Sequence, residues 1–287
     1  MIKLLFRVLI VLFISIISFS CRVQTNEKKH DAKGKLYIIG GGKRPVEMVQ
    51  QMIELSGAKN GAYVAVLPMS SYEPDTAAYW AMKQFKDLGM YNIASFNFEK
   101  GQPVEQSAID SIINAGMIYI SGGDQNRFMD IVSGTPIFNA IHTAYQNGAV
   151  IAGTSAGAAV QSKKMITGNQ LLQPEMVGYK TIQPNNIEVA EGLGLIETAI
   201  IDQHFIWRER LNRLITVCIE NPKQLAIGID ESTAILIKGN TAKVYGLSQV
   251  LVLNALNAKT STADSLLGAQ NIRMDIYLPG ESFSIVP

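Results

Sequence analysis

The sequence predicts an α/β fold built on a largely parallel sheet with helices on both faces. Through the first two thirds of the chain from Lys35, short apolar segments alternate with longer segments of helical periodicity, which is typical of βαβ units. After Glu231 the apolar segments are short and follow one another without helices, which predicts an antiparallel extension. The 287 residues, 47% of them hydrophobic, suffice for a substantial core. No repeat or linker interrupts residues 35–287, so we expect one domain there.

Each expected element follows from its local pattern. The apolar segments predict strands at residues 36–39, 63–67, 93–96, 117–120, 149–152, 199–201, 226–229, 234–237, 243–245 and 250–253. The periodic segments predict helices at residues 45–55, 76–88, 104–115, 136–146 and 208–220. In the segment 136–146, for example, Asn139, His142 and Gln146 share one polar face at helical spacing.

The first twenty residues, 1–20, are expected to be a signal peptide rather than part of the domain. Lys3 and Arg7 precede an apolar run that is short for a membrane span and ends shortly before Cys21. The segment resembles a bacterial lipoprotein signal, in which Cys21 becomes the acylated first residue. An uncleaved anchor and an ordinary secretory signal are the alternatives. Residues 21–34 then form a flexible tether, so the domain is exported to the bacterial cell envelope and held to the membrane by this lipid alone.

Charge and cysteine content argue against several function classes. The chain has 25 basic and 24 acidic residues, scattered without a basic stripe, so we expect no nucleic-acid partner. The two cysteines, Cys21 and Cys218, cannot build a disulfide framework or a Cys/His metal cluster. We expect neither a metal nor an organic cofactor.

A candidate nucleophile lies in the motif Gly-x-Ser-x-Gly at residues 153–157. An apolar segment runs into the motif and small residues follow it, so Ser155 is predicted to sit on a tight strand-to-helix turn that exposes its hydroxyl. The amide of Ala156, at the start of the next helix, points to where an oxyanion would form. An ordinary glycine-bounded turn is the alternative, unless the chain also supplies a base.

The chain has three histidines, and one of them is placed for chemistry. His30 lies in a polar run typical of a tether, and His142 lies on the polar face of a predicted helix. His204 instead follows an apolar strand segment, and ligands of open α/β sheets bind at the carboxyl ends of strands. It therefore shares a predicted sheet edge with Ser155, which favours a general base over a structural histidine.

Two glycine-rich loops follow predicted strands. Residues 40–42 lack the spaced third glycine of a dinucleotide-binding fingerprint, so a tight turn at the mouth of the site is the better interpretation. Residues 122–125 end another strand, and glycines there let the backbone approach a ligand closely. The amide of Gly123 is a candidate second oxyanion donor, and Gln125 is a candidate substrate ligand.

Four motifs together carry a family resemblance. They are Gly122-Gly123-Asp124-Gln125, the elbow from Gly153 to Ala158, Asp202-Gln203-His204-Phe205 with Arg208, Arg210 and Arg213, and Gly228-Ile229-Asp230-Glu231. In order and approximate spacing they resemble the cyanophycinases, which belong to a serine peptidase family that also contains bacterial aspartyl dipeptidases. The similarity covers nearly all of the chain from Lys35 to Leu253. It implies a three-layer α/β/α domain like that of class I glutamine amidotransferases, a homodimer, and the order Ser, His, Glu along the chain.

The resemblance implies that Ser155 is the nucleophile, His204 the general base and Glu231 the carboxylate that orients the histidine. Asp230 and Asp202 remain competitors for the third role. The implied substrate pocket contains Gln125, Asp202, Gln203, Arg208, Arg210 and Arg213.

Two features of this implied pocket bear on the substrate. Arginine suits bidentate capture of carboxylates. The alternative is that at least one of the three arginines is merely solvated, with Glu209 and Glu220 as surface partners. Asn126 and Phe128 differ from the side chains that the family often has, which leaves the substrate open.

These expectations combine into one function. We expect an exported, lipid-anchored serine peptidase that cleaves aspartyl peptide bonds in cyanophycin or a related β-linked aspartyl peptide. Its partner is then a peptide rich in aspartate. The alternatives are an aspartyl dipeptidase, an amidotransferase-like hydrolase of small amides, and a surface-anchored binding protein without turnover. The last ranks behind, because Ser155, His204 and Glu231 are all present.

Overall fold

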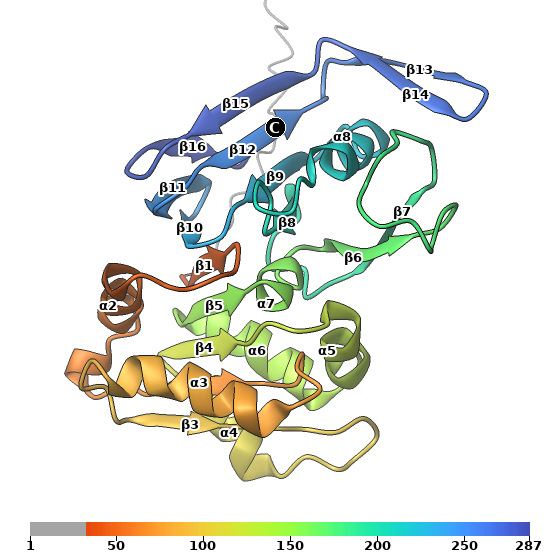
Figure 1. The fold of residues 1–287 in the computed structure, drawn as a ribbon. Helices are drawn as coiled ribbons and strands as arrows, with labels where there is room; N and C mark the ends of the chain where they lie inside the picture. The colour runs from red at the N-terminus through yellow and green to blue at the C-terminus, as the bar shows by residue number, and fades with distance from the viewer. Residues whose placement is uncertain (1–32) are drawn as a thin grey trace, which may run out of the picture.

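A computed structural model describes residues 33–287, so the predicted signal peptide, most of the tether and Cys21 lie outside the described residues. The chain forms an eight-stranded sheet in the order β16-β11-β10-β1-β5-β4-β2-β3 (Figure 1). Five strands, from β1 to β3 in this order, pair in parallel, whereas β10, β11 and β16 are joined to the sheet by antiparallel pairs. The bounds are Lys35–Ile39 (β1), Val64–Leu67 (β2), Ile93–Ser95 (β3), Met117–Ile120 (β4), Val150–Thr154 (β5), Thr233–Lys238 (β10), Thr241–Gly246 (β11) and Ser282–Ser284 (β16). The predicted mostly parallel α/β sheet with an antiparallel extension is confirmed.

Helices cover both faces of this sheet because its central strands are apolar on both sides. On β1, Tyr37 and Ile39 pack in one core with α2 (Val46–Leu55) and α3 (Pro74–Lys86). Leu36 and Ile38 point the other way, into the core that contains the helices of the opposite face. Those helices are α4 (Gln106–Ile113), α5 (Gln125–Val132) and α6 (Pro136–Asn147).

A second sheet, in the order β15-β12-β9-β8, packs against the antiparallel part of the first. Ile227 and Val252 of this sheet share a core with Ile235 of β10. On the opposite face, Leu251 packs with Leu214 of the covering helix α8. The elements are β8 (Ala199–Gln203), α8 (Leu211–Glu220), β9 (Leu225–Ile229), β12 (Val250–Asn254) and β15 (Arg273–Tyr277). The strands expected at 199–201, 226–229 and 250–253 therefore exist, but they form a sheet of their own.

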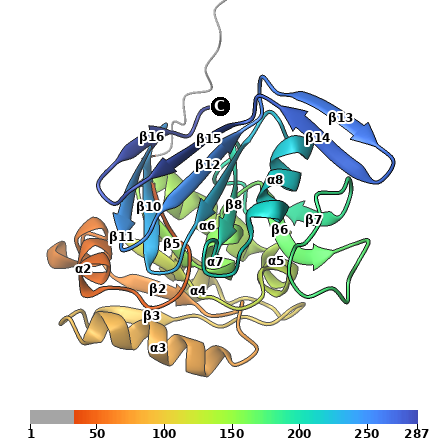
Figure 2. The same ribbon diagram turned by 45° about the horizontal axis from the view of Figure 1, so that its top comes forward.

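Several elements are absent from the sequence prediction. They are the 3₁₀ helix η1 (Ala58–Asn60), helix α5, the two-stranded sheets β6 (Lys164–Gln170) with β7 (Ile187–Glu191) and β13 (Lys259–Ala263) with β14 (Leu266–Gln270), and strands β15 and β16. Every residue of β13 is exposed, so this strand carries no buried apolar face to reveal it. The β13–β14 hairpin projects from the body in both views (Figure 1, Figure 2).

Within residues 33–287, no helix is both long and apolar enough to cross a membrane. In the same part of the chain, no three His, Cys, Asp or Glu side chains are grouped to hold a metal ion. Cys218 is a buried free thiol on α8.

Candidate active site

Ser155 occupies a strained turn between β5 and the short helix α7 (Ala156–Ala159), with φ of 53° and ψ of −111°. Its amide donates to the carbonyl of Ile39 over 3.0 Å, which holds the turn against β1. A Cβ at Gly153 would lie 2.0 Å from the carbonyl oxygen of Gly157, and a Cβ at Gly157 would lie 2.3 Å from that of Ile120. Only glycine fits at the positions two residues before and two residues after Ser155, as a nucleophile elbow requires.

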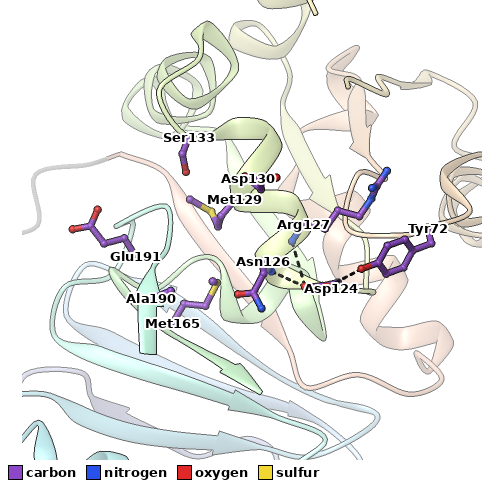
Figure 3. A pocket seen from close by; sticks show the side chains of 10 residues that line it. All are labelled: Tyr72, Asp124, Asn126, Arg127, Met129, Asp130, Ser133, Met165, Ala190 and Glu191. Atoms are coloured by element: carbon purple, nitrogen blue, oxygen red, sulfur yellow. Dashed lines mark hydrogen bonds between the residues drawn. The ribbon is translucent and has the colours of Figure 1, made fainter. Parts of the chain in front are cut away.

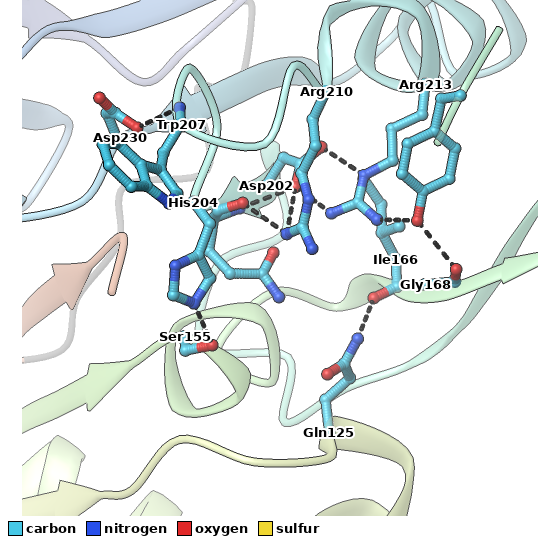
Figure 4. A network of polar contacts seen from close by, with 12 residues as sticks. Gln125, Ser155, Ile166, Gly168, Asp202, His204, Trp207, Arg210, Arg213 and Asp230 are labelled. Carbon is cyan, nitrogen blue, oxygen red and sulfur yellow. Dashed lines mark hydrogen bonds and ion pairs between the residues drawn. The ribbon is translucent and has the colours of Figure 1, made fainter. Parts of the chain in front are cut away.

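The hydroxyl of Ser155, the ring of His204 and the carboxylate of Glu231 form one continuous hydrogen-bonded series. His204 Nε2 lies 2.8 Å from Ser155 Oγ, a contact visible in Figure 4. His204 Nδ1 lies 2.5 Å from Glu231 Oε1. With the Nδ1 proton donated to Glu231, Nε2 is left as the acceptor for the serine hydroxyl.

The two competing carboxylates lie elsewhere. Asp230 accepts hydrogen bonds from the amides of Ile206 and Trp207, over 3.1 and 2.9 Å, and from the hydroxyl of Ser248 over 2.8 Å. Asp202 is fully buried and forms a bidentate pair with Arg213. The structure therefore brings Glu231, and neither aspartate, to the histidine.

The pKa of His204 is lowered from its ordinary value. Burial is the main cause, because it penalises the charged ring, and the nearby cations Arg208 and Arg210 lower the pKa further. The hydrogen bond and the charge of Glu231 act in the opposite direction. The net effect keeps the imidazole neutral near neutral pH, which is the form that can accept a proton.

The glycine-rich loop after β1 encloses the histidine and the glutamate. A Cβ on Gly41 would lie 2.2 Å from Cε1 of His204, and a Cβ on Gly42 would lie 2.8 Å from the carboxylate of Glu231. The carbonyl of Gly40 accepts the backbone amide of His204 over 2.7 Å. The prediction of a tight turn at the site did not identify these contacts, and the run of three glycines is the signal that points to them.

The two predicted oxyanion donors lie in the segments that adjoin Ser155. Ala156 is fully buried and is the first residue of α7. On the other side, a Cβ at Gly122 would lie 3.3 Å from Cβ of Ser155, which places the Gly122–Gly123 turn against the serine. Gly123 has a φ of 141° and approaches the carbonyl of Ser70 too closely for a side chain.

The predicted substrate ligands divide into two groups. Asp202 and Arg213 are paired with each other and buried, so they lie beneath the surface of the site. Arg208 is exposed, and Arg210 keeps 12% of its side chain exposed while it donates to the carbonyl of Gln203 over 2.6 Å.

The two glutamines also differ in their contacts. Gln125 is buried and donates to the backbone carbonyls of Ile166 and Thr167 over 2.9 and 2.6 Å. Oε1 of Gln203 is buried without a hydrogen-bond partner among the described residues.

An open pocket of about 680 Å³ runs beside α5 (Figure 3). At one end, Asp124 directly follows Gly123, caps α5 and accepts the hydroxyl of Tyr72 over 3.0 Å. The guanidinium of Arg127 lies 5.1 Å from the centre of the Tyr72 ring. The lining residues are Tyr72, Asp124, Asn126, Arg127, Met129, Asp130, Ser133, Met165, Ala190 and Glu191. Apart from Asn126, which was noted only as a departure from the family, the sequence singled out none of them as a pocket residue.

Comparison with known proteins places this chain in a family. The family model described as peptidase family S51 matches residues 36–245. A cyanophycinase from Nostoc sp. is 30% identical over 266 residues, which cover 88% of this chain and 86% of that protein. A cyanophycinase from Geminocystis herdmanii is 28% identical over 89% of this chain and 95% of its own length.

Solved structures share the fold. A peptidase from an acI-B1 actinobacterium superimposes with a TM-score of 0.65 at 22% identity, over 90% of this chain and 99% of that one. A putative peptidase E from Listeria monocytogenes gives a TM-score of 0.51 at 17% identity, over 75% and 99%. Since the family model spans most of the chain, the protein belongs to peptidase family S51 and is a serine-type peptidase of cyanophycinase-like sequence.

Proposed function

We propose that this peptidase hydrolyses aspartyl peptide bonds, in cyanophycin or in related β-linked aspartyl peptides, with Ser155, His204 and Glu231 as its catalytic triad. The observation that carries the proposal is the unbroken contact from Glu231 through His204 to Ser155, at 2.5 and 2.8 Å. The substrate class is supported by relatives named cyanophycinase, which are 26–30% identical to this chain over most of its length.

The geometry supports hydrolysis through an acyl-enzyme. Neutral His204 takes the hydroxyl proton of Ser155 while Oγ attacks the carbonyl carbon, and the carbonyl electron pair moves onto oxygen. The amides near Gly123 and Ala156 are the candidate donors to that oxyanion. Collapse expels the amine, which takes the proton from His204 and leaves the acyl group on Ser155. Water then attacks the ester carbon while His204 takes its proton, and the acyl carbon–Oγ bond breaks. His204 returns the proton to Ser155 Oγ, and the carboxylic acid product leaves.

We assign Arg210 as the cation that receives a substrate carboxylate. Arg210 and Arg213 both lie near Asp202, so two positive charges face one negative charge. Burial, and then the neighbouring Arg213, lower the pKa of Arg210 to about 10, which leaves it charged at neutral pH. A substrate carboxylate would restore neutrality, while a neutral group in its place would not.

We further propose that the peptidase is exported as a lipoprotein and held to the envelope through Cys21. The basic residues Lys3 and Arg7, the apolar run after them and Cys21 support this proposal. The lipid and the tether would hold the peptidase at a membrane surface while the domain meets its substrate.

Replacement of the nucleophile tests the proposed chemistry. We expect Ser155→Ala to fold normally and to lose several orders of magnitude in the rate of hydrolysis, because triad members act as a unit. The assay measures release of amine from cyanophycin and from a panel of α- and β-aspartyl dipeptides. Near-normal turnover by the variant would exclude the serine mechanism. Cleavage of dipeptides but not of the polymer would instead assign an aspartyl dipeptidase.

A further inference from the structure

Tyr179 joins two sides of the active site from the long loop between β6 and β7. Its hydroxyl donates to the carbonyl of Gly168 over 2.9 Å and accepts from Nη1 of Arg213 over 2.5 Å. The Arg213 guanidinium lies over its ring at 4.6 Å from the centre. Its backbone carbonyl accepts from the side chain of Asn212 over 2.9 Å. Four contacts therefore hold one tyrosine that sequence reasoning did not single out.

One side of this network leads to Gln125. Gly168 lies beside the amide of Gln125, since a Cβ on Gly168 would be 3.8 Å from Gln125 Nε2. Gln125 holds the preceding carbonyls of Ile166 (Figure 4) and Thr167. The β6–β7 register shifts after Ile166. Tyr179 and Gln125 thus hold the same irregular segment of β6 at successive carbonyls.

The other side leads to the residues next to the histidine. Arg213, 1% exposed, uses Nε and Nη2 for the two oxygens of Asp202 and Nη1 for the Tyr179 hydroxyl. Asp202 also accepts the amide of Gln203 over 2.8 Å, and Nη1 of Arg210 stands 3.7 Å from one of its oxygens. The buried carboxylate of Asp202 therefore interacts with both arginines, and its interaction with Arg213 is the closer one.

We propose that Tyr179 is a specificity-determining positioning residue, which holds Arg213 on Asp202 and so leaves the charge of Arg210 available to an acidic substrate. This inference rests on the proposed recognition of a substrate carboxylate by Arg210. Without the hydroxyl, one N–H of a buried guanidinium loses its acceptor, and the Arg213–Asp202 pair loosens. Asp202 then pairs more closely with Arg210 and neutralises the charge that a substrate would meet.

The test compares acidic substrates with neutral substrates of the same shape. Matched α-linked peptides carry aspartate or asparagine, each with a free side chain, at the residue whose carbonyl is cleaved, and kcat and KM are measured with the full chain. Tyr179→Phe should reduce the preference for aspartate in kcat/KM about tenfold, mainly through KM. The rate of labelling of Ser155 by a neutral fluorophosphonate should stay within about twofold, because Tyr179 contacts neither Ser155 nor His204. Asn212→Ala, which frees only the backbone carbonyl of Tyr179, should act in the same direction but less strongly.

Tyr37→Phe is the matched control, because it removes a buried hydroxyl that donates to Gln51 over 2.8 Å in the α2-side core. It should change thermal stability without changing the aspartate preference. Arg210→Gln should abolish the preference. An unchanged preference in Tyr179→Phe, with the loss in Arg210→Gln retained, would overturn the role of Tyr179 alone. Unchanged preference in both variants would overturn the proposed carboxylate pocket and Tyr179's role with it.

Discussion

Ser155 and His204 both adopt left-handed backbone conformations, with φ of 53° and 49°. Such conformations are costly for residues with side chains and persist only where surrounding contacts enforce them. Here the enforcing contacts come from one place, since the amide of Ser155 donates to Ile39 and that of His204 donates to Gly40. The end of β1 therefore holds both residues of the proposed proton transfer at the required backbone angles.

Replacement of Glu231 should separate its role from that of its neighbour. Glu231→Gln keeps the shape but removes the charge that stabilises a protonated His204, so we expect kcat to fall on the order of a hundred- to ten thousandfold, with less change in KM. Asp230→Asn should reduce kcat much less, because Asp230 contacts backbone amides rather than the ring. Steady-state kinetics of both variants decide, and a larger loss in Asp230→Asn would contradict the assignment.

The lowered pKa of His204 predicts the acid limb of activity. The neutral, active ring is present above that pKa, so kcat/KM should rise with pH and reach half its plateau below the ordinary histidine pKa of about 6.5. Arg208 is one of the cations that lower the pKa, so Arg208→Gln should move this limb to higher pH. The pH dependence of the rate at which a neutral fluorophosphonate labels Ser155 measures this rise, because the probe carries no carboxylate that could itself change the pKa of His204. A shift to lower pH would contradict the predicted influence of Arg208.

At the scale of elements, three turns make the site. The elbow after β5 carries Ser155, the turn after β8 carries His204, and the connection between β9 and β10 carries Glu231. The glycine loop after β1 closes around the last two. Turns are suited to this task because the rigid strands before them set their positions while their own backbones adopt unusual angles.

The glycine loop should tolerate no side chain at Gly41. In Gly41→Ala the new methyl group would meet the His204 ring at 2.2 Å, so the ring must move. A displacement of that kind is expected to lower kcat about a hundredfold. Gly61→Ala is the control, since Gly61 also has a positive φ but has open space around its Cβ position. Circular dichroism and kinetics should find both variants folded and only Gly41→Ala impaired, and equal activities would contradict the prediction.

At the scale of the whole molecule, the site lies at the seam between two sheets. Ser155 belongs to the large sheet, whereas His204 follows a strand of the second sheet. Glu231 lies where the chain passes from the second sheet back to the first. The distance between serine and histidine therefore depends on how the sheets pack, through core residues such as Ile229 and Ile235.

The proposed export belongs to the whole chain and is tested on it. Cys21→Ser should abolish labelling with a radioactive or clickable fatty acid, and should release the protein from membrane fractions or stop its processing. Cys218→Ser, at a thiol buried on α8, should leave labelling unchanged. Continued membrane retention of correctly cleaved Cys21→Ser would show that another group is the anchor.

The sequence by itself determined the local features of this protein. Because residues buried on both faces leave an unbroken apolar pattern, apolar runs and periodicity identified the strands of the parallel half and its helices α2, α3, α4 and α6, but not α5. The motif around Ser155 and the position of His204 after a strand identified two residues that the structure brings to 2.8 Å.

Only the tertiary structure decided which of Glu231, Asp230 and Asp202 reaches His204, that Arg213 is buried on Asp202, and that the later strands form a second sheet. Each of these depends on contacts between different elements of the fold. The pattern of a strand shows that the strand is buried but not which strand pairs with it. In the same way, the sequence around a carboxylate does not show which cation will pair with it.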